Sequence, residues 1–161
     1  MAGQRGLDAL DVLLLSLIRA HPRVGILELS RLAGVARATV QARLRRMEES
    51  GVITGYGPDV DVTAAGFPVQ SYVTLEIAQG GLDEVAAALY GIPGVLEACA
   101  TTGSSDVLCR VAAASHQDLQ ATLLALNRVA GVVRSTSVVV LSTVVAPRVL
   151  PLLQSDQAGQ N

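Results

Sequence analysis

Five arginines and no acidic residue lie within residues 29–47 of this 161-residue chain. A surface dense in guanidinium groups can neutralise phosphates, and each planar guanidinium can also reach two acceptors on a guanine. The charge is local: residues 1–60 carry eight arginines against six acidic residues, a net of +2, whereas the remainder carries four against eight, a net of −4. The stretch is therefore a candidate DNA-binding surface.

Two predicted helices position these arginines. The first spans about residues 26–33 and the second about residues 37–49, and Gly34 allows the sharp turn that joins two crossing helices. An earlier apolar-periodic segment, 7–18, predicts another helix, which ends before a proline. The three short helices are expected to share one small core and to form a helix-turn-helix.

Within the second of these helices, Val40, Leu44 and Met47 form an inward apolar stripe at i, i+4 and i+7. The side chains in the opposite direction and at the N-terminal turn are expected to enter the major groove. We assign Arg37, Gln41 and Arg45 to base contacts, and Thr39 and Arg46 to phosphates. The alternative interpretation is the solvated face of an ordinary helix.

Arg43 points closer to the edge of the core than its neighbours. It is expected either to contact DNA or to form an ion pair with Glu28 or Glu48, and the sequence does not favour one over the other.

The pattern after residue 66 changes to alternating strands and helices. The expected order is strand 69–77, helix 82–90, strand 95–102, strand 106–113, a helix capped by Ser115 that runs through Ala130, and strand 132–141. This βαββαβ order predicts a ferredoxin-like domain, so the fold class is α+β, with a winged helix-turn-helix followed by that domain.

Four segments follow from these patterns. Residues 1–57 are the expected DNA-binding domain, 58–66 a hinge or linker, 67–148 the ferredoxin-like domain, and 149–161 a C-terminal tail that is polar and loose from Gln154 onward. Segment 52–62 mixes strand-forming residues with glycine and proline, as a wing or hinge would.

Enzyme classes find little support, because the chain has no phosphate-binding glycine loop, zinc-ligand spacing or paired-carboxylate pattern. No cofactor and no metal are expected. Cys99 and Cys109 lack metal or redox spacing and are expected to be buried, reduced thiols. No signal peptide is visible, and the most apolar segment, 138–153, is interrupted by polar residues and prolines. We expect a cytoplasmic protein without a membrane span.

The chain contains several short motifs whose order and spacing, taken together, are specific for one protein family. They are Leu7-Asp8-x-x-Asp11, Glu28-Leu29-Ser30, Gly34-Val35, Val40-x-x-Arg43-Leu44-x-x-Met47-Glu48, Gly51-Val52-Ile53-Thr54-Gly55-Tyr56, Pro93-Gly94-Val95, Thr102-Gly103-x-x-Asp106 and Gly131-Val132. Over nearly its whole length the chain resembles the Lrp/AsnC (feast/famine) family of transcription regulators.

The resemblance implies an N-terminal winged helix-turn-helix, a hinge strand, and a C-terminal domain that senses an amino acid, dimerises through its sheet and assembles into octamers. Two departures stand out. Ala36 occupies the position where the family usually has a serine that caps the recognition helix, and Ser104-Ser105 replace acidic and aromatic residues often seen between the glycine and the aspartate.

The loop between the second and third strands is the candidate effector site. The backbone N–H groups at Gly103 and the carboxylate of Asp106 suit the carboxylate and ammonium groups of a free amino acid. The residues assigned to the effector are Gly103, Ser104, Ser105, Asp106 and Ser137. A glycine near an aspartate is also an everyday hairpin turn, so that alternative stays open.

The sequence thus predicts a regulator that binds double-stranded DNA as a homodimer and responds to an amino acid. One alternative is an architectural oligomer that compacts DNA without an effector. Another is a ferredoxin-like subunit whose helical part contacts protein instead of DNA.

Overall fold

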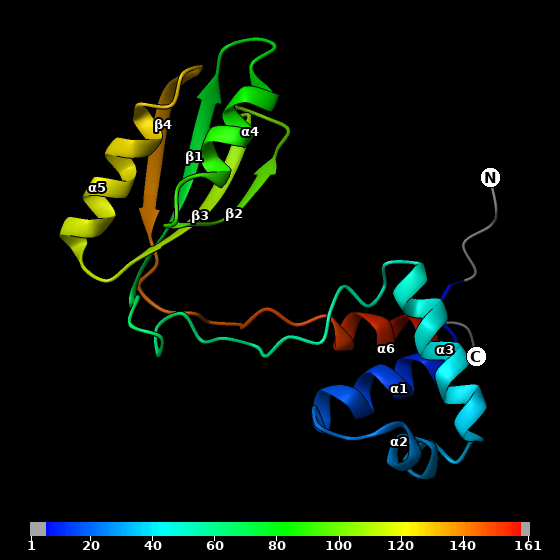
Figure 1. Ribbon diagram of the computed structural model, residues 1–161. Helices are drawn as coiled ribbons and strands as arrows, with labels where there is room; N and C mark the ends of the chain where they lie inside the picture. Colours follow the sequence, from blue (N-terminus) through cyan, green and yellow to red (C-terminus); the bar gives the residue numbers. More distant parts are fainter. Residues whose placement is uncertain (1–5, 159–161) are drawn as a thin grey trace. The chain divides into compact units, whose positions relative to one another are not determined.

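The computed structural model describes residues 6–158 of the protein, which divide into two compact units. One unit contains the chain up to Pro58 and the segment from Val145 onward, and we call it the helical unit. The other contains Asp59–Val144, and we call it the sheet unit. Figure 1 shows helices alone in the first unit and a sheet with two helices in the second.

The helical unit is built on the helices α1 (Ala9–Ala20), α2 (Ile26–Ala33) and α3 (Arg37–Glu49). The bounds of α2 and α3 agree with the sequence prediction. The three helices share one apolar core, as expected, because each contributes its apolar stripe to it. The buried members of this core are Leu14, Leu29, Val40, Leu44 and Met47.

The helix α6 (Leu150–Ala158) includes residues 154–158, which the sequence predicted to be loose, so that prediction was wrong for these residues. α6 contacts α1, and this contact stabilises a segment whose own sequence gives little sign of a helix. Pro151 is in its first turn, where the missing N–H costs no helical hydrogen bond. Residues 150–158 therefore belong to the helical unit and are not a separate tail.

Residues 52–62, whose composition predicted a wing or hinge, form no strand in the described chain, and the hinge strand that the resemblance implied is absent between residues 50 and 68. The segment contains strand-forming residues, but a strand needs a neighbour to satisfy its backbone N–H and C=O groups. No segment of the described chain pairs with residues 52–62.

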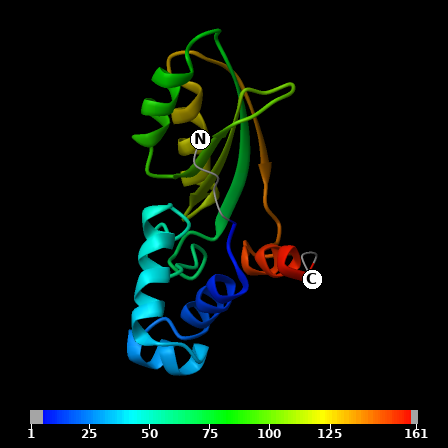
Figure 2. The same cartoon turned by 90° about the vertical axis from the view of Figure 1, so that its right-hand side faces the viewer.

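The sheet unit has the order predicted from the sequence. Its elements are β1 (Val69–Ile77), α4 (Leu82–Tyr90), β2 (Val95–Ala100), β3 (Val107–Ala113), α5 (His116–Asn127) and β4 (Val132–Val139). The strands lie in the order β2-β3-β1-β4, and all neighbours are antiparallel. Figure 2 shows α4 and α5 on the same face of this sheet. The βαββαβ prediction is confirmed, with α5 ending three residues earlier than expected because the chain turns after Asn127.

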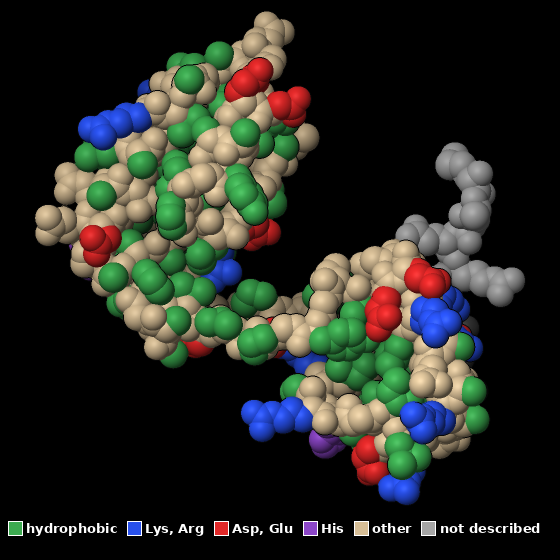
Figure 3. Space-filling model, viewed as in Figure 1, with side chains coloured by type: hydrophobic (Ala, Val, Ile, Leu, Met, Phe, Trp, Pro, Cys, Tyr) green, Lys and Arg blue, Asp and Glu red, His purple; other side chains and the backbone are tan. Residues whose placement is uncertain are grey.

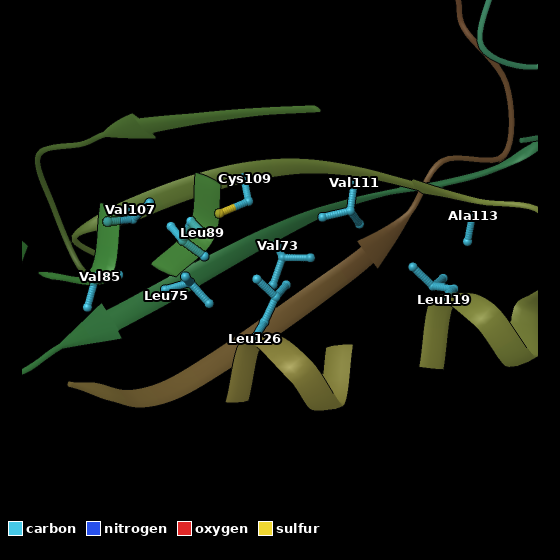
Figure 4. Close-up of a cluster of buried hydrophobic side chains, with 10 residues drawn as sticks. All are labelled: Val73, Leu75, Val85, Leu89, Val107, Cys109, Val111, Ala113, Leu119 and Leu126. Carbon is cyan, nitrogen blue, oxygen red and sulfur yellow. The ribbon is translucent and has the colours of Figure 1, made fainter. Parts of the chain in front are cut away.

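The core of the sheet unit lies between the sheet and its two helices. In Figure 4, Leu126 points from α5 toward Val73 of β1, and Leu89 of α4 lies near Cys109 of β3. Gly94 lets α5 approach the sheet closely, because a Cβ at this residue would lie 3.0 Å from the Thr122 side chain.

No helix of residues 6–158 packs against the opposite face of the sheet. Tyr72 and Val138, which pair across β1 and β4, have exposed fractions of 45% and 65%.

Cys99 pairs with Leu108 and is exposed, so the prediction that both cysteines are buried was wrong for this residue. Cys109 points toward the helices, is fully buried, and has its pKa raised to about 11 by burial and by the nearby Cys99 thiol.

Candidate DNA-binding surface and effector loop

Two left-handed glycines fix where the elements around α3 begin and end. Gly34 ends α2 with a φ of +67°, and the next amide, of Val35, donates to the carbonyl of Ser30 at 3.1 Å. Gly51 follows α3 with a φ of +74°, and the Val52 amide donates to the carbonyl of Met47 at 2.9 Å. The Gly34 turn, which joins α2 to α3, is the one that the sequence predicted.

The side chains of α3 divide into a buried and an exposed face. Val40 and Met47 are 0% and 1% exposed, which confirms the inward stripe. Arg37, Gln41 and Arg45 are exposed, as base-contacting side chains must be. Within residues 6–158, neither Arg37 nor Arg45 forms an ion pair, so both guanidinium groups are available to a ligand.

The start of α3 contains Thr39, which the sequence assigned to a phosphate, and Ala36, which the sequence placed at the N-cap. Thr39 is half-buried in the first turn. Ala36 occupies the N-cap position with no side-chain hydrogen bond to the helix, as expected for alanine. The N-terminal N–H groups of α3 therefore have no cap from the N-cap side chain.

The remaining two arginines of α3 are tied to α1. Arg43 forms ion pairs with both Asp8 and Asp11, the latter at 3.3 Å, and Arg46 forms an ion pair with Asp11. Both alternatives for an Arg43 ion pair, Glu28 and Glu48, were wrong. Arg46, which the sequence assigned to a phosphate, already has a carboxylate partner.

The two carboxylates are held in place by the start of α1. The Asp11 N–H donates to Oδ1 of Asp8, and the Asp8 N–H donates to Oδ2 of Asp11, each at 3.0 Å, which makes a reciprocal capping box. Asp11 is fully buried, and all of its partners come from α1 and α3. Sequence reasoning missed this cluster, although Asp8 and Asp11 share the i, i+3 spacing of Arg43 and Arg46.

The ion pairs also shift two pKa values. Partial burial acts to raise the pKa of Asp8, but the Arg43 hydrogen bond and the capping-box N–H outweigh it, and the pKa falls below its usual value. The hydrogen bond to Asp8 in turn raises the pKa of Arg43. Both groups are therefore charged at neutral pH.

A hollow of about 410 Å³ borders the exposed face of α3. Gln41 and Arg45 line it, together with apolar side chains of α1 and α2. Tyr56 also lines the hollow and donates a hydrogen bond of 2.5 Å to Glu48. Burial and this carboxylate raise the pKa of Tyr56 to about 12, so its hydroxyl stays a donor at neutral pH. Sequence reasoning did not predict this pair.

The predicted effector loop, residues 103–106, joins β2 to β3. Gly103 is exposed and has a φ of +117°, which only glycine adopts without strain. The Asp106 carboxylate accepts a hydrogen bond from the Ile77 N–H at 2.8 Å, and the Asp106 N–H donates to the Leu75 carbonyl at 2.9 Å. The loop is thereby fastened to the end of β1, and Asp106 has an internal partner.

The other predicted effector residues lie differently. Ser104 is exposed, and the carbonyl of Ser105 accepts a hydrogen bond from the Thr101 hydroxyl at 2.8 Å. Ser137 lies on β4 and pairs with Val73 of β1. Asp106 instead contacts Ile77 of β1, which pairs with Val132 at the other end of β4. Within one chain, Ser137 does not join the loop.

Two further properties bear on the class of site. No group of three or more histidine, cysteine or acidic side chains that could hold a metal ion occurs in the described part of the chain. None of the helices between residues 6 and 158 has the length and hydrophobicity that crossing a bilayer requires.

An exposed, arginine-bearing second helix of a helix-turn-helix, joined to a ferredoxin-like domain, defines a DNA-binding transcriptional regulator. Residues 7–54 match the winged helix-turn-helix DNA-binding domain, and residues 70–150 match the Lrp/AsnC ligand binding domain. The chain belongs to the Lrp/AsnC family.

Individual proteins agree with this assignment. The HTH-type transcriptional regulator Rv2324 of Mycobacterium tuberculosis is 35% identical over 141 residues, which cover 86% of this chain and 95% of that protein. Among solved structures, AsnC of E. coli has the same fold, with a TM-score of 0.83, 24% identity, and coverage of 90% of this chain and 99% of the other. The Neisseria meningitidis regulator NMB0573, solved as a complex with L-Met, also shares the fold, with a TM-score of 0.78, 22% identity, and coverage of 87% and 93%.

Proposed function

We propose that the protein recognises a specific DNA sequence through the exposed face of α3. Arg37, Gln41 and Arg45 contact base edges in the major groove, and Thr39 contacts a phosphate at the N-terminal turn. The observation that carries this proposal is the pair of exposed arginines that have no ion-pair partner in the described chain. An unpaired guanidinium pays no cost of breaking an ion pair when it meets guanine.

The protein acts as a homodimer, because two recognition helices must meet half-sites about one helical turn of DNA apart. The uncovered face of the sheet supports this proposal, since it exposes Tyr72 and Val138 where a second copy could bury them. The family resemblance extends the proposal to octamers. With DNA as its partner, the protein works in the cytoplasm.

The regulated step is the binding of an amino acid at the loop 103–106 of the paired sheet units. The complex of the Neisseria meningitidis regulator with L-Met supports an amino acid as the class of effector. Effector binding shifts the spacing of the two recognition helices, and a change of a few ångströms alters the affinity for a fixed pair of half-sites.

The test of the DNA proposal is the double variant Gln41→Ala/Arg45→Ala. Its preference for the specific site over competitor DNA should be lost, whereas Arg134→Ala, which removes one arginine from the sheet unit, should keep it. Circular dichroism checks that both variants are folded. Unchanged site preference in the double variant would remove Gln41 and Arg45 from the recognition surface.

The test of the effector proposal is a thermal-shift screen with all amino acids. One of them should raise the Tm of the wild type but not that of Asp106→Ala, with Asp83→Asn as a control for the loss of one exposed carboxylate. A flat response across the panel would contradict the proposal.

The second candidate function is a DNA-architectural oligomer without an effector. The bond between the Asp106 carboxylate and the Ile77 N–H favours it, because this internal partner competes with a ligand ammonium group. Footprints that spread along DNA without sequence preference, together with a flat thermal-shift response, would support this alternative.

A further inference from the structure

We propose that Asp8 and Asp11 withhold Arg43 and Arg46 from DNA, and thereby set the strength and the salt dependence of DNA binding. The proposal rests on the DNA-binding role of α3 and assigns a further role to side chains of α1. The four arginines of α3 then form two pairs. Arg37 and Arg45 are available to DNA, and Arg43 and Arg46 are held by the two acids.

The geometry fixes the acids before they meet the arginines. Each carboxylate accepts the backbone N–H of the other residue at 3.0 Å, so neither is free to rotate away from the first turn of α1. Their remaining oxygen lone pairs point to α3, where Arg43 contacts both acids and Arg46 contacts the buried one. The two carboxylates are therefore held in position to bind both guanidinium groups.

The charges of this cluster cancel. Two carboxylates face two guanidinium groups, so half of the four arginines of α3 carry no net charge toward a ligand. The lowered pKa of Asp8 keeps its carboxylate ionised at the pH of DNA binding. The local positive surface is therefore weaker than the arginine content of residues 29–47 indicates.

The withheld arginines remain near the surface. The side chains of Arg43 and Arg46 have exposed fractions of 29% and 44%. A guanidinium at this level of exposure can turn to a phosphate once its carboxylate is neutralised, because the aliphatic part of the side chain is long and flexible. Loss of the Asp8 charge leaves Asp11 as the one carboxylate between Arg43 and Arg46, and the cluster then carries one net positive charge.

The consequence is weaker binding to DNA of every sequence, with the ratio of specific to nonspecific affinity set by the base contacts alone. Phosphate contacts add affinity for every DNA sequence alike, whereas base contacts add affinity only at the correct site. By removing two arginines from the phosphate-binding set, the acids lower nonspecific binding and leave discrimination to the exposed face of α3.

The experiment measures the affinity for specific and nonspecific DNA between 50 and 200 mM salt. The main variant is Asp8→Asn, because asparagine is as good an N-cap as aspartate and Asp8 is half-exposed, so α1 is preserved. The matched control is Glu49→Gln, which adds the same charge to α3 at an exposed residue that holds no arginine in residues 6–158.

Asp8→Asn should steepen the dependence of log affinity on log salt by about 0.9 for each recognition helix bound, relative to Glu49→Gln. Between 50 and 200 mM salt, the affinity loss should therefore grow by about 3.5-fold per helix. The gain at low salt should be as large on nonspecific DNA as on the specific site. Asp8→Asn/Arg43→Gln, which restores neutrality, should return to the wild-type salt dependence.

Arg43→Gln alone provides the second test, and it should leave the salt dependence of the wild type unchanged. A shallower salt dependence in this variant would mean that Arg43 contacts phosphate in the wild-type complex, and would overturn the proposal. Equal salt dependence in Asp8→Asn and Glu49→Gln would overturn it as well. If wild-type binding itself ignores salt, both this proposal and the proposed DNA-binding mode fail. If wild-type binding is salt-sensitive, failure in the variants removes this proposal alone.

Discussion

Both units of the protein have an apolar core, but within residues 6–158 only the helical unit adds a fully buried acid to it. In the helical unit the fully buried Asp11 joins α1 to α3 through two arginines. In the sheet unit the buried side chains around Val73 and Leu126 are apolar, and the buried hydroxyl of Ser71 donates to the Val138 carbonyl at 2.9 Å. In the view of Figure 3, blue and red side chains lie close together on the helical unit, whereas on the sheet unit they are scattered among green and tan ones.

This difference indicates what each unit must hold constant. An ion pair with several hydrogen bonds has directional geometry, so it fixes the rotation of α3 as well as its distance from α1. Apolar packing is less directional and tolerates small shifts between elements. A unit that presents side chains to DNA needs the first property, and a unit that responds to a ligand is served by the second.

The largest expected effect comes from removal of the buried acid. Asp11→Ala removes three hydrogen bonds to a buried carboxylate at once, from the Asp8 N–H, Arg43 and Arg46, and should cost about 3–5 kcal/mol of unfolding free energy. Hydrogen exchange should rise in α1 and α3 and stay unchanged in β1. Glu49→Ala, an exposed acid on α3, should cost less than about 0.5 kcal/mol. A loss of that small size in Asp11→Ala would mean that packing alone positions α3.

The converse change tests the sheet unit. Leu126→Ala opens a cavity at a fully buried position and should cost about 2–5 kcal/mol, seen as faster hydrogen exchange in β1 and α5 with α3 unaffected. Leu124, which is half-exposed on the same helix, supplies the control, and its replacement by alanine should cost less than about 0.5 kcal/mol. Equal losses in the two variants would contradict the position of this core.

A smaller effect is expected at the helix N-caps of the two units. Ala36→Ser should add about 1 kcal/mol by giving α3 the cap that it lacks, and Ser115→Ala should remove about 1 kcal/mol from α5. Thermal unfolding measures both changes. A neutral result for Ala36→Ser would show that the α2–α3 turn prevents the serine from reaching the helix N–H groups.

The smallest effect concerns acid stability. Because Arg43 lowers the pKa of Asp8, the stabilisation from this pair is fully present above about pH 4, the ordinary pKa of aspartate, and is lost as pH falls through the lower folded value. The wild type should lose stability more steeply than Asp8→Asn in this range, and Arg43→Gln should behave as Asp8→Asn does. Identical pH profiles for all three proteins would contradict the pairing.

Much of the fold could be predicted from the sequence because local patterns determine it. The bounds of α2, α3 and α4 follow from apolar spacing and from the glycines around them, and the βαββαβ order follows from alternation of patterns. The unpredicted parts depend on contacts between distant segments. α6 forms against α1, and segment 52–62 lacks the partner that a strand requires.

The same distinction applies to the candidate sites. The exposed face of α3 follows from helical periodicity, so Arg37, Gln41 and Arg45 could be placed from the sequence. The partners of Arg43 and Arg46 could not, because they are 35 residues away and depend on how α1 crosses α3. The internal bond of Asp106 depends on the pairing of β1 with β3, which no local pattern contains.

The central claim is that the exposed face of α3 contacts DNA and that Arg43 and Arg46, which are paired with Asp8 and Asp11, do not. The most direct test compares Arg45→Gln with Arg43→Gln in binding to the DNA upstream of the protein's own gene, at several salt concentrations. Arg45→Gln should lose about 1–3 kcal/mol of specific binding, and Arg43→Gln should stay within about threefold of the wild type at each salt concentration. Equal losses in the two variants, or wild-type binding that ignores both site and salt, would contradict the account.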